Sequence, residues 1–83
     1  MSEVRVRVLA FGHYAEVLGA ESLEVTARPG MTVRDALEMV RERPGGKLLP
    51  AHILCALNLR QAEPADLVRE GDELALLPPL AGG

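Results

Sequence analysis

Strict alternation of hydrophobic and polar positions marks the first two strands of the chain. Residues 4–8 alternate valine with arginine, and this period of two predicts a strand with one buried face. We expect the valines in the core, Arg5 and Arg7 in water, and Phe11, at the apolar end of the strand, in the core. Gly12 ends this strand, and residues 13–18 predict one or two helical turns. Residues 22–26 alternate again and predict a second strand beside the first.

The pattern then changes to that of an amphipathic helix. Thr32 is a preferred N-cap residue, and Asp35, three positions later, makes a variant of the capping box. The apolar residues that follow have the spacing i, i+3, i+4, i+7 and form one stripe that packs on a sheet: Val33, Ala36, Leu37 and Val40. Pro44 disfavours helical backbone at the residue before it, so the helix is predicted to end there.

The second half of the chain predicts further strands around this single helix. Residues 53–59 are almost continuously apolar and predict a strand, residues 60–62 a short edge strand, and residues 64–67 one tight helical turn. Residues 73–77 predict the last strand. One amphipathic helix must then cover a mixed sheet of four to five strands. We interpret this order as an α+β β-grasp fold, residues 1–77, whose last strand lies centrally, beside the first and parallel to it.

The last six residues form a tail of unusual composition, 78–83. Pro78 and Pro79 cannot donate to a β-ladder, and each proline fixes φ near −65°, so the backbone leaves the sheet stiff and extended. Fully extended, the six residues span roughly 20 Å at about 3.3–3.6 Å per residue. The final two have no side chain, so the terminal carboxylate fits a narrow passage. The predicted functional segment is Pro78, Pro79, Leu80, Ala81, Gly82 and Gly83.

Composition excludes several classes of function. The net charge of −3 and the presence of only two aromatic residues argue against nucleic-acid binding. No apolar stretch approaches the ~20 residues that span a bilayer, so no membrane association is expected. Cys55 is the single cysteine, which favours a reduced, cytoplasmic setting, and we expect it to be a buried apolar residue. His13 and His52 stand alone at predicted turns, so no metal site is expected.

The chain resembles the small, ubiquitin-like sulfur-carrier subunit of molybdopterin synthase. The resemblance spans nearly the whole chain, and its most specific part is the terminal Pro-Pro-x-Ala-Gly-Gly. Ala15 departs from the pattern, because relatives often carry arginine there. The matching residues are Phe11, Glu16 and Gly19, then 56–58, 70–73 and 77–83.

The resemblance implies a carrier rather than an enzyme. An adenylyltransferase of the ubiquitin-activating kind would adenylate Gly83, and a cysteine desulfurase or rhodanese-like donor would supply sulfur to give a C-terminal thiocarboxylate. The tail would then enter the large synthase subunit and donate sulfur to a pyranopterin precursor of the molybdenum cofactor. No cofactor would be bound, the adenylate and thiocarboxylate being transient covalent forms, and all catalytic side chains would belong to the partners.

Other functions stay open at this point. The same fold and activation chemistry would serve a sulfur carrier of thiamine synthesis or of a tungsten-cofactor pathway, although the proline pair speaks against the thiamine carrier by resemblance. A ubiquitin-like protein modifier, or an interaction domain with an idle tail, is also compatible with the chain. We expect a larger subunit to dock on the sheet face opposite the helix, through Leu9, Leu57 and Leu76 or their neighbours.

Overall fold

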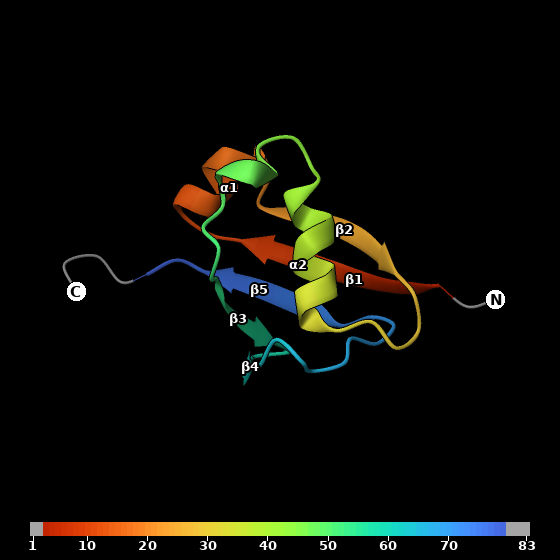
Figure 1. Cartoon of the computed structure of the whole chain (residues 1–83). Coiled ribbons are helices and arrows are strands. Elements are labelled where there is room, and N and C mark those ends of the chain that lie inside the picture. The colour runs from red at the N-terminus through yellow and green to blue at the C-terminus, as the bar shows by residue number, and fades with distance from the viewer. Residues whose placement is uncertain (1–2, 80–83) are drawn as a thin grey trace.

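The computed structural model describes residues 3–79. Its elements are β1 (Val4–Ala10), α1 (His13–Leu18), β2 (Ser22–Ala27), α2 (Val33–Arg41), the 3₁₀ turn η1 (Gly46–Leu48), β3 (Leu54–Leu57), β4 (Arg60–Ala62) and β5 (Glu73–Leu77). The strands form one five-stranded sheet in the order β2-β1-β5-β3-β4. Neighbours are antiparallel except β1 and β5, which are parallel. The predicted β-grasp topology, with the last strand central and parallel to the first, is confirmed (Figure 1).

The main helix α2 lies across one face of this sheet (Figure 1). The capping box predicted at its start is present: the Thr32 hydroxyl accepts a hydrogen bond from the Asp35 backbone N–H, and the Asp35 carboxylate accepts one from the Thr32 N–H at 2.9 Å. Three residues of the apolar stripe, Val33, Ala36 and Val40, are buried against the sheet. The helix therefore begins at the predicted cap, and the predicted apolar stripe packs on the sheet.

The core lies between α2 and the inner face of the sheet. In β1 every second residue is buried, in the order that the valine–arginine alternation predicts. Cys55 on β3 is buried as expected. The largest side chains that are fully buried come from β1, β2, β5 and α2: Leu74, Leu76, Val6, Val8, Val25 and Val40. Apolar burial therefore holds the inner faces of β1 and β5 in place. Because the tail continues directly from β5, its base is rigid.

At residues 64–67, where one tight helical turn was predicted, the chain makes a single hydrogen-bonded turn and no helix: the Asp66 N–H donates to the Glu63 carbonyl at 3.0 Å. The carbonyl groups of Pro64 and Asp66 instead accept hydrogen bonds from the Arg34 and Val33 N–H groups, at 3.0 and 2.8 Å. The first N–H groups of a helix have no partner inside it, so this loop satisfies the start of α2 and its carbonyls are unavailable for a helix of their own. Leu67 forms an isolated bridge with Thr32.

Candidate functional site

The tail leaves the sheet from the middle strand. At the last residues of β5, Leu76 pairs with Ala10 of β1, and Leu77 pairs with Leu54 of β3, so backbone neighbours hold the strand on both sides. Pro78 and Pro79 follow outside the strand, the first half-buried and the second exposed, as the missing N–H groups require. The predicted site residues Leu80, Ala81, Gly82 and Gly83 lie outside the described residues.

Gly12 lies beside the base of the tail. Its backbone, with φ 55° and ψ −128°, and the hydrogen bond from the Tyr14 N–H to the Phe11 carbonyl at 3.1 Å describe a type II′ turn, which favours glycine at this position. A Cβ atom on residue 12 would lie 3.8 Å from Cγ of Pro78. The chain that links β1 to α1 therefore passes directly beside the first residue of the tail.

The sheet face opposite α2, here called the open face, has a different character at its two ends. Strand register places its residues in rows across the sheet. The row of Glu24, Arg7 and Glu73 is charged. The next row toward the tail consists of small or polar residues and one leucine, namely Ser22, Leu9, Ala75, Ala56 and Gln61. Nearest the tail, Leu77 and Leu54 stand side by side.

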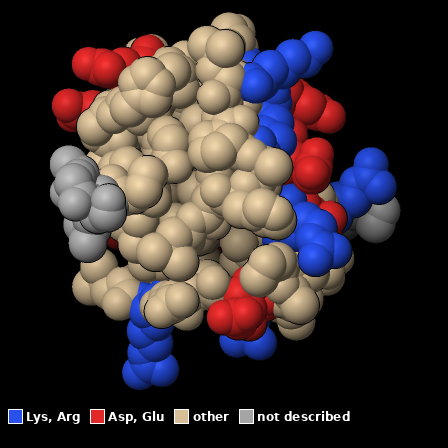
Figure 2. All heavy atoms as spheres, turned by 60° about the vertical axis from the view of Figure 1, so that its left-hand side comes forward, with Lys and Arg blue, Asp and Glu red and all other residues tan. Residues whose placement is uncertain are grey.

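The tail end of the open face is apolar and accessible. Phe11 is 47% exposed and Leu54 is 56% exposed, while Leu77 and Leu9 are half-buried. Figure 2 views the tail end of the molecule from the α2 side and shows mainly uncharged residues there, with charged side chains at the margins. On the open face itself, accessible apolar side chains at neighbouring register positions are typical of a protein–protein contact.

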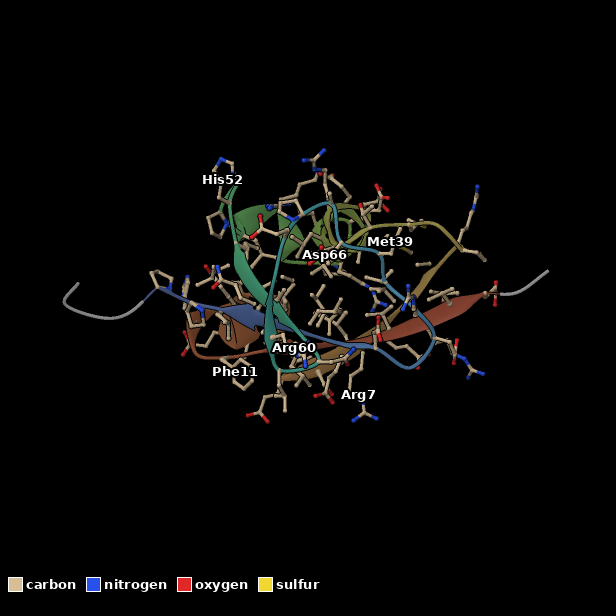
Figure 3. All side chains as sticks on the ribbon, turned by 90° about the horizontal axis from the view of Figure 1, so that it is seen from below. Arg7, Phe11, Met39, His52, Arg60 and Asp66 are labelled. Carbon is tan, nitrogen blue, oxygen red and sulfur yellow. The ribbon has the colours of Figure 1, made fainter. Side chains whose placement is uncertain are left out.

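Two sequence-based expectations about this surface are wrong. Phe11 was expected in the core, yet alternation continued from Leu9 places it on the open face, pointing away from α2 (Figure 3). The expected docking residues were Leu9, Leu57 and Leu76 or their neighbours. Leu57 and Leu76 do not face outward, because Leu76 is fully buried and Leu57 pairs with the buried Leu74 and packs on the core. On the open face lie Leu9, Leu54 and Leu77, the neighbour of Leu76.

The far end of the open face carries exposed ion pairs. The Arg5 Nε lies 3.7 Å from a Glu70 carboxylate oxygen, and an Arg7 guanidinium nitrogen lies 4.0 Å from that of Glu73. All four side chains are at least two-fifths exposed, so these pairs contribute little to folding stability. Arg5 and Arg7 thus reach water as predicted, and they line a shallow charged hollow with Glu24 and Asp72.

The titratable side chains of residues 3–79 bear on two further kinds of site, a metal centre and a reactive thiol. No three His, Cys, Asp or Glu residues of this range gather as metal ligands. Burial raises the pKa of the Cys55 thiol to about 11, with Arg41 acting weakly in the opposite direction, so Cys55 is a neutral thiol at physiological pH. The Nδ1 atom of His13 lies 3.4 Å from a Glu16 carboxylate oxygen. Within this range, none of the helices has the length and apolar character needed to cross a membrane.

The comparisons with known proteins agree with this geometry. Residues 8–83 match the ThiS family. A molybdopterin synthase sulfur carrier subunit of Arabidopsis thaliana is 31% identical over 83 residues, which cover 99% of this chain and 86% of that protein. Among solved structures, small archaeal modifier protein 1 of Haloferax volcanii has a TM-score of 0.83 at 30% identity, covering 93% of this chain and 99% of the other.

A second solved structure contains two proteins. In the complex of subunits 1 and 2 of molybdopterin-converting factor from Helicobacter pylori, the matching chain has a TM-score of 0.70 at 25% identity, covering 96% of this chain and 100% of its own length. Sequence and fold therefore lead to the same assignment: this chain is a member of the ThiS family, with the ubiquitin-like β-grasp fold.

Proposed function

We propose that this chain is the sulfur-carrier subunit of a molybdopterin synthase and carries its sulfur on the C-terminal Gly83. The observation that supports this most strongly is the 31% identity, along almost the whole chain, to a protein named molybdopterin synthase sulfur carrier subunit. The terminal Pro-Pro-Leu-Ala-Gly-Gly sequence supports it further. The chain acts as a carrier in a reduced, cytoplasmic compartment, and its partners supply the catalytic side chains.

The carrier cycle begins with activation of the C-terminus. A carboxylate with a pKa near 3.5 is anionic at neutral pH and is a poor electrophile. In the adenylyltransferase, a Gly83 carboxylate oxygen attacks the α-phosphorus of ATP and pyrophosphate leaves. The outer sulfur of a persulfide on the cysteine desulfurase or rhodanese-like donor then adds to the acyl carbon, and AMP leaves with the former carboxylate oxygen. A second thiol attacks the donor sulfur of the resulting acyl disulfide, which releases the thiocarboxylate and leaves a disulfide between the two thiols. The product is a thiocarboxylate at Gly83.

Transfer takes place in the cavity of a large synthase subunit. The thiocarboxylate sulfur adds to a carbon of the pyranopterin precursor, and an oxygen substituent leaves that carbon. Water then cleaves the bond between sulfur and the acyl carbon, which regenerates the Gly83 carboxylate. A dithiolene contains two sulfur atoms, so each product molecule consumes two loaded carriers. The adenylate and the thiocarboxylate are transient covalent forms of the carrier, as is the thioester that briefly joins it to the precursor, and no resident cofactor takes part.

The architecture supports this use of the tail. Residues 78–83 span roughly 20 Å when extended, at about 3.3–3.6 Å per residue, and begin at a strand that is paired on both sides. We propose that the large subunit docks on the apolar end of the open face, around Phe11, Leu54 and Leu77. Docking there places the partner's cavity beside the first residue of the tail.

The proposed function is tested by loading the chain in vitro. The purified chain is incubated with the adenylyltransferase, ATP and a sulfide source, and its intact mass is measured. We expect a gain equal to the replacement of one oxygen by sulfur, located at Gly83 by fragmentation. A variant without Gly82 and Gly83 serves as the control and gains nothing. An unchanged mass in the full-length chain, with an adenylyltransferase that loads its own known carrier, would contradict the proposal.

Conjugation to other proteins is a second candidate function. It is favoured by the 30% identity to a solved structure named small archaeal modifier protein 1. A modifier uses the same activated Gly83, but a lysine amine attacks the acyl carbon in place of sulfide. Cells that express a tagged chain would then show a ladder of conjugates on a blot, which disappears in the variant without Gly82 and Gly83. A carrier of sulfur alone gives a single band.

A further inference from the structure

The turn between β3 and β4 presents a leucine to solvent in left-handed backbone. Leu57 pairs with Arg60, so the loop consists of Asn58 and Leu59 alone. Their φ angles are +52° and +73°, the pattern of a type I′ turn, which strongly favours glycine at its second position. Leu59 is 92% exposed, more than any other large apolar residue of the described chain. Packing against residues 3–79 does not offset the unfavourable backbone.

Hydrogen bonds fix this turn to the start of β5. The Asn58 N–H donates to the Glu73 carbonyl at 2.8 Å, and the Glu73 N–H donates to the Asn58 side-chain oxygen at 2.9 Å. The Asn58 side-chain amide also donates to the Asp72 carboxylate at 2.8 Å. Leu59 is therefore held out on a rigid turn rather than on a flexible loop. A rigid, exposed apolar side chain loses little conformational entropy when a partner binds it.

The turn and the tail stand at opposite ends of the same strand. Asn58 contacts Glu73, the first residue of β5, and the tail follows Leu77, the last. At about 3.3 Å per residue, these ends are roughly 15 Å apart. Figure 3 shows the turn beside Arg60 at the edge of the sheet, at the end of the β3–β4 hairpin that lies away from α2. A partner that takes the tail and covers the open face reaches Leu59 within a contact of ordinary size.

We propose that Leu59 is an anchor residue that enters an apolar pocket of the large synthase subunit. This proposal rests on the proposed function and adds a second contact, remote from the tail, that fixes the orientation of the docked carrier. Residues that fill a partner's pocket contribute a large share of binding energy. The anchor also accounts for a leucine at a position where glycine would make the isolated chain more stable.

The test measures stability and affinity in the same variants. Leu59→Gly relieves the left-handed leucine and creates an Asn-Gly turn, so we expect its melting temperature to rise by about 4 °C. Its affinity for the large subunit, measured by calorimetry with the full-length chain, should fall at least about tenfold. A merely structural role for Leu59 would not lower affinity while raising stability.

A matched pair of variants provides the control. Leu59→Asn keeps a residue that tolerates left-handed backbone and should bind as weakly as Leu59→Gly. Leu48→Asn makes the same change at a leucine that is 72% exposed, on η1, and should bind like the unaltered chain. If all variants bind the large subunit with equal affinity, Leu59 is not an anchor residue, although the proposed function is unaffected. The same conclusion holds if the Leu59 variants bind only the adenylyltransferase more weakly. An unaltered chain that binds no large subunit would overturn both.

Discussion

Neighbouring leucines at the end of β5 should separate folding from partner binding. Leu76 is fully buried between the sheet and α2, whereas Leu77 lies on the open face beside Leu54. Truncation of a buried leucine to alanine costs about 2–5 kcal/mol of unfolding free energy. In a chain of this size each kcal/mol lowers the melting temperature by about 4–8 °C, so Leu76→Ala should lower it by roughly 8–40 °C.

Leu77→Ala should behave in the opposite way. The side chain is already partly in water, so its truncation costs about 1 kcal/mol or less of unfolding free energy. If the open face docks the large subunit, removal of an apolar contact beside the tail should lower the affinity about tenfold or more.

Thermal unfolding followed by circular dichroism gives the first quantity, and calorimetry at a temperature where both variants are folded gives the second. Our assignment of faces would be refuted if Leu77→Ala unfolded as early as Leu76→Ala, or if Leu77→Ala bound the large subunit as tightly as the unaltered chain.

Three further predictions follow from the structure. Removal of Gly82 and Gly83 should leave the melting temperature unchanged within about 1 °C, because the core lies in the sheet and helix. A clear loss of stability would instead show that the tail supports the fold. With a pKa raised from 9.0 to about 11, Cys55 should react with a maleimide at pH 8 about 100-fold more slowly in the folded chain than after unfolding. The same pKa shift makes the folded chain less stable as pH rises from 9 toward 11, because only the unfolded thiol ionises readily in this range. Equal maleimide reaction rates in the folded and unfolded chain would contradict both statements. Gly45→Ala should cost at least about 3 kcal/mol, because its Cβ would lie 1.8 Å from the Val17 carbonyl oxygen, whereas Gly30→Ala, with φ +90° but open space, should cost about 1 kcal/mol. Similar melting temperatures for the two glycine variants would argue against that close contact.

The topology could be predicted from the sequence because the hydrophobic periodicity and the turn and capping residues indicate the same elements along most of the chain. The alternating valines of β1 and the apolar stripe of α2 can each leave water only if one face of the element is buried. The strand 53–59 was predicted too long, since Asn58 and Leu59 form a turn rather than strand. Their dipeptide lacks the glycine that normally marks a two-residue hairpin loop.

The docking residues were harder to predict than the fold. Leu76 and Leu77 are the same residue type in the same strand, so composition cannot say which one faces the core. Strand register decides this, and register depends on partners elsewhere in the chain. Phe11 was placed in the core because the apolar end of the first strand suggested burial of both faces, although the alternation that begins at Val4 already puts it on the open face.

The central claim is that the C-terminal atoms of this chain carry the sulfur that reaches the pterin. The most direct measurement starts from chain prepared chemically with a thiocarboxylate at Gly83 and mixed with the large subunit and the pyranopterin precursor. We predict that the intact mass of the chain returns to that of the carboxylate as the dithiolene product forms, with two carriers consumed for each product. Product formed while the thiocarboxylate persists, or a thiocarboxylate that the complex never consumes, would contradict the account.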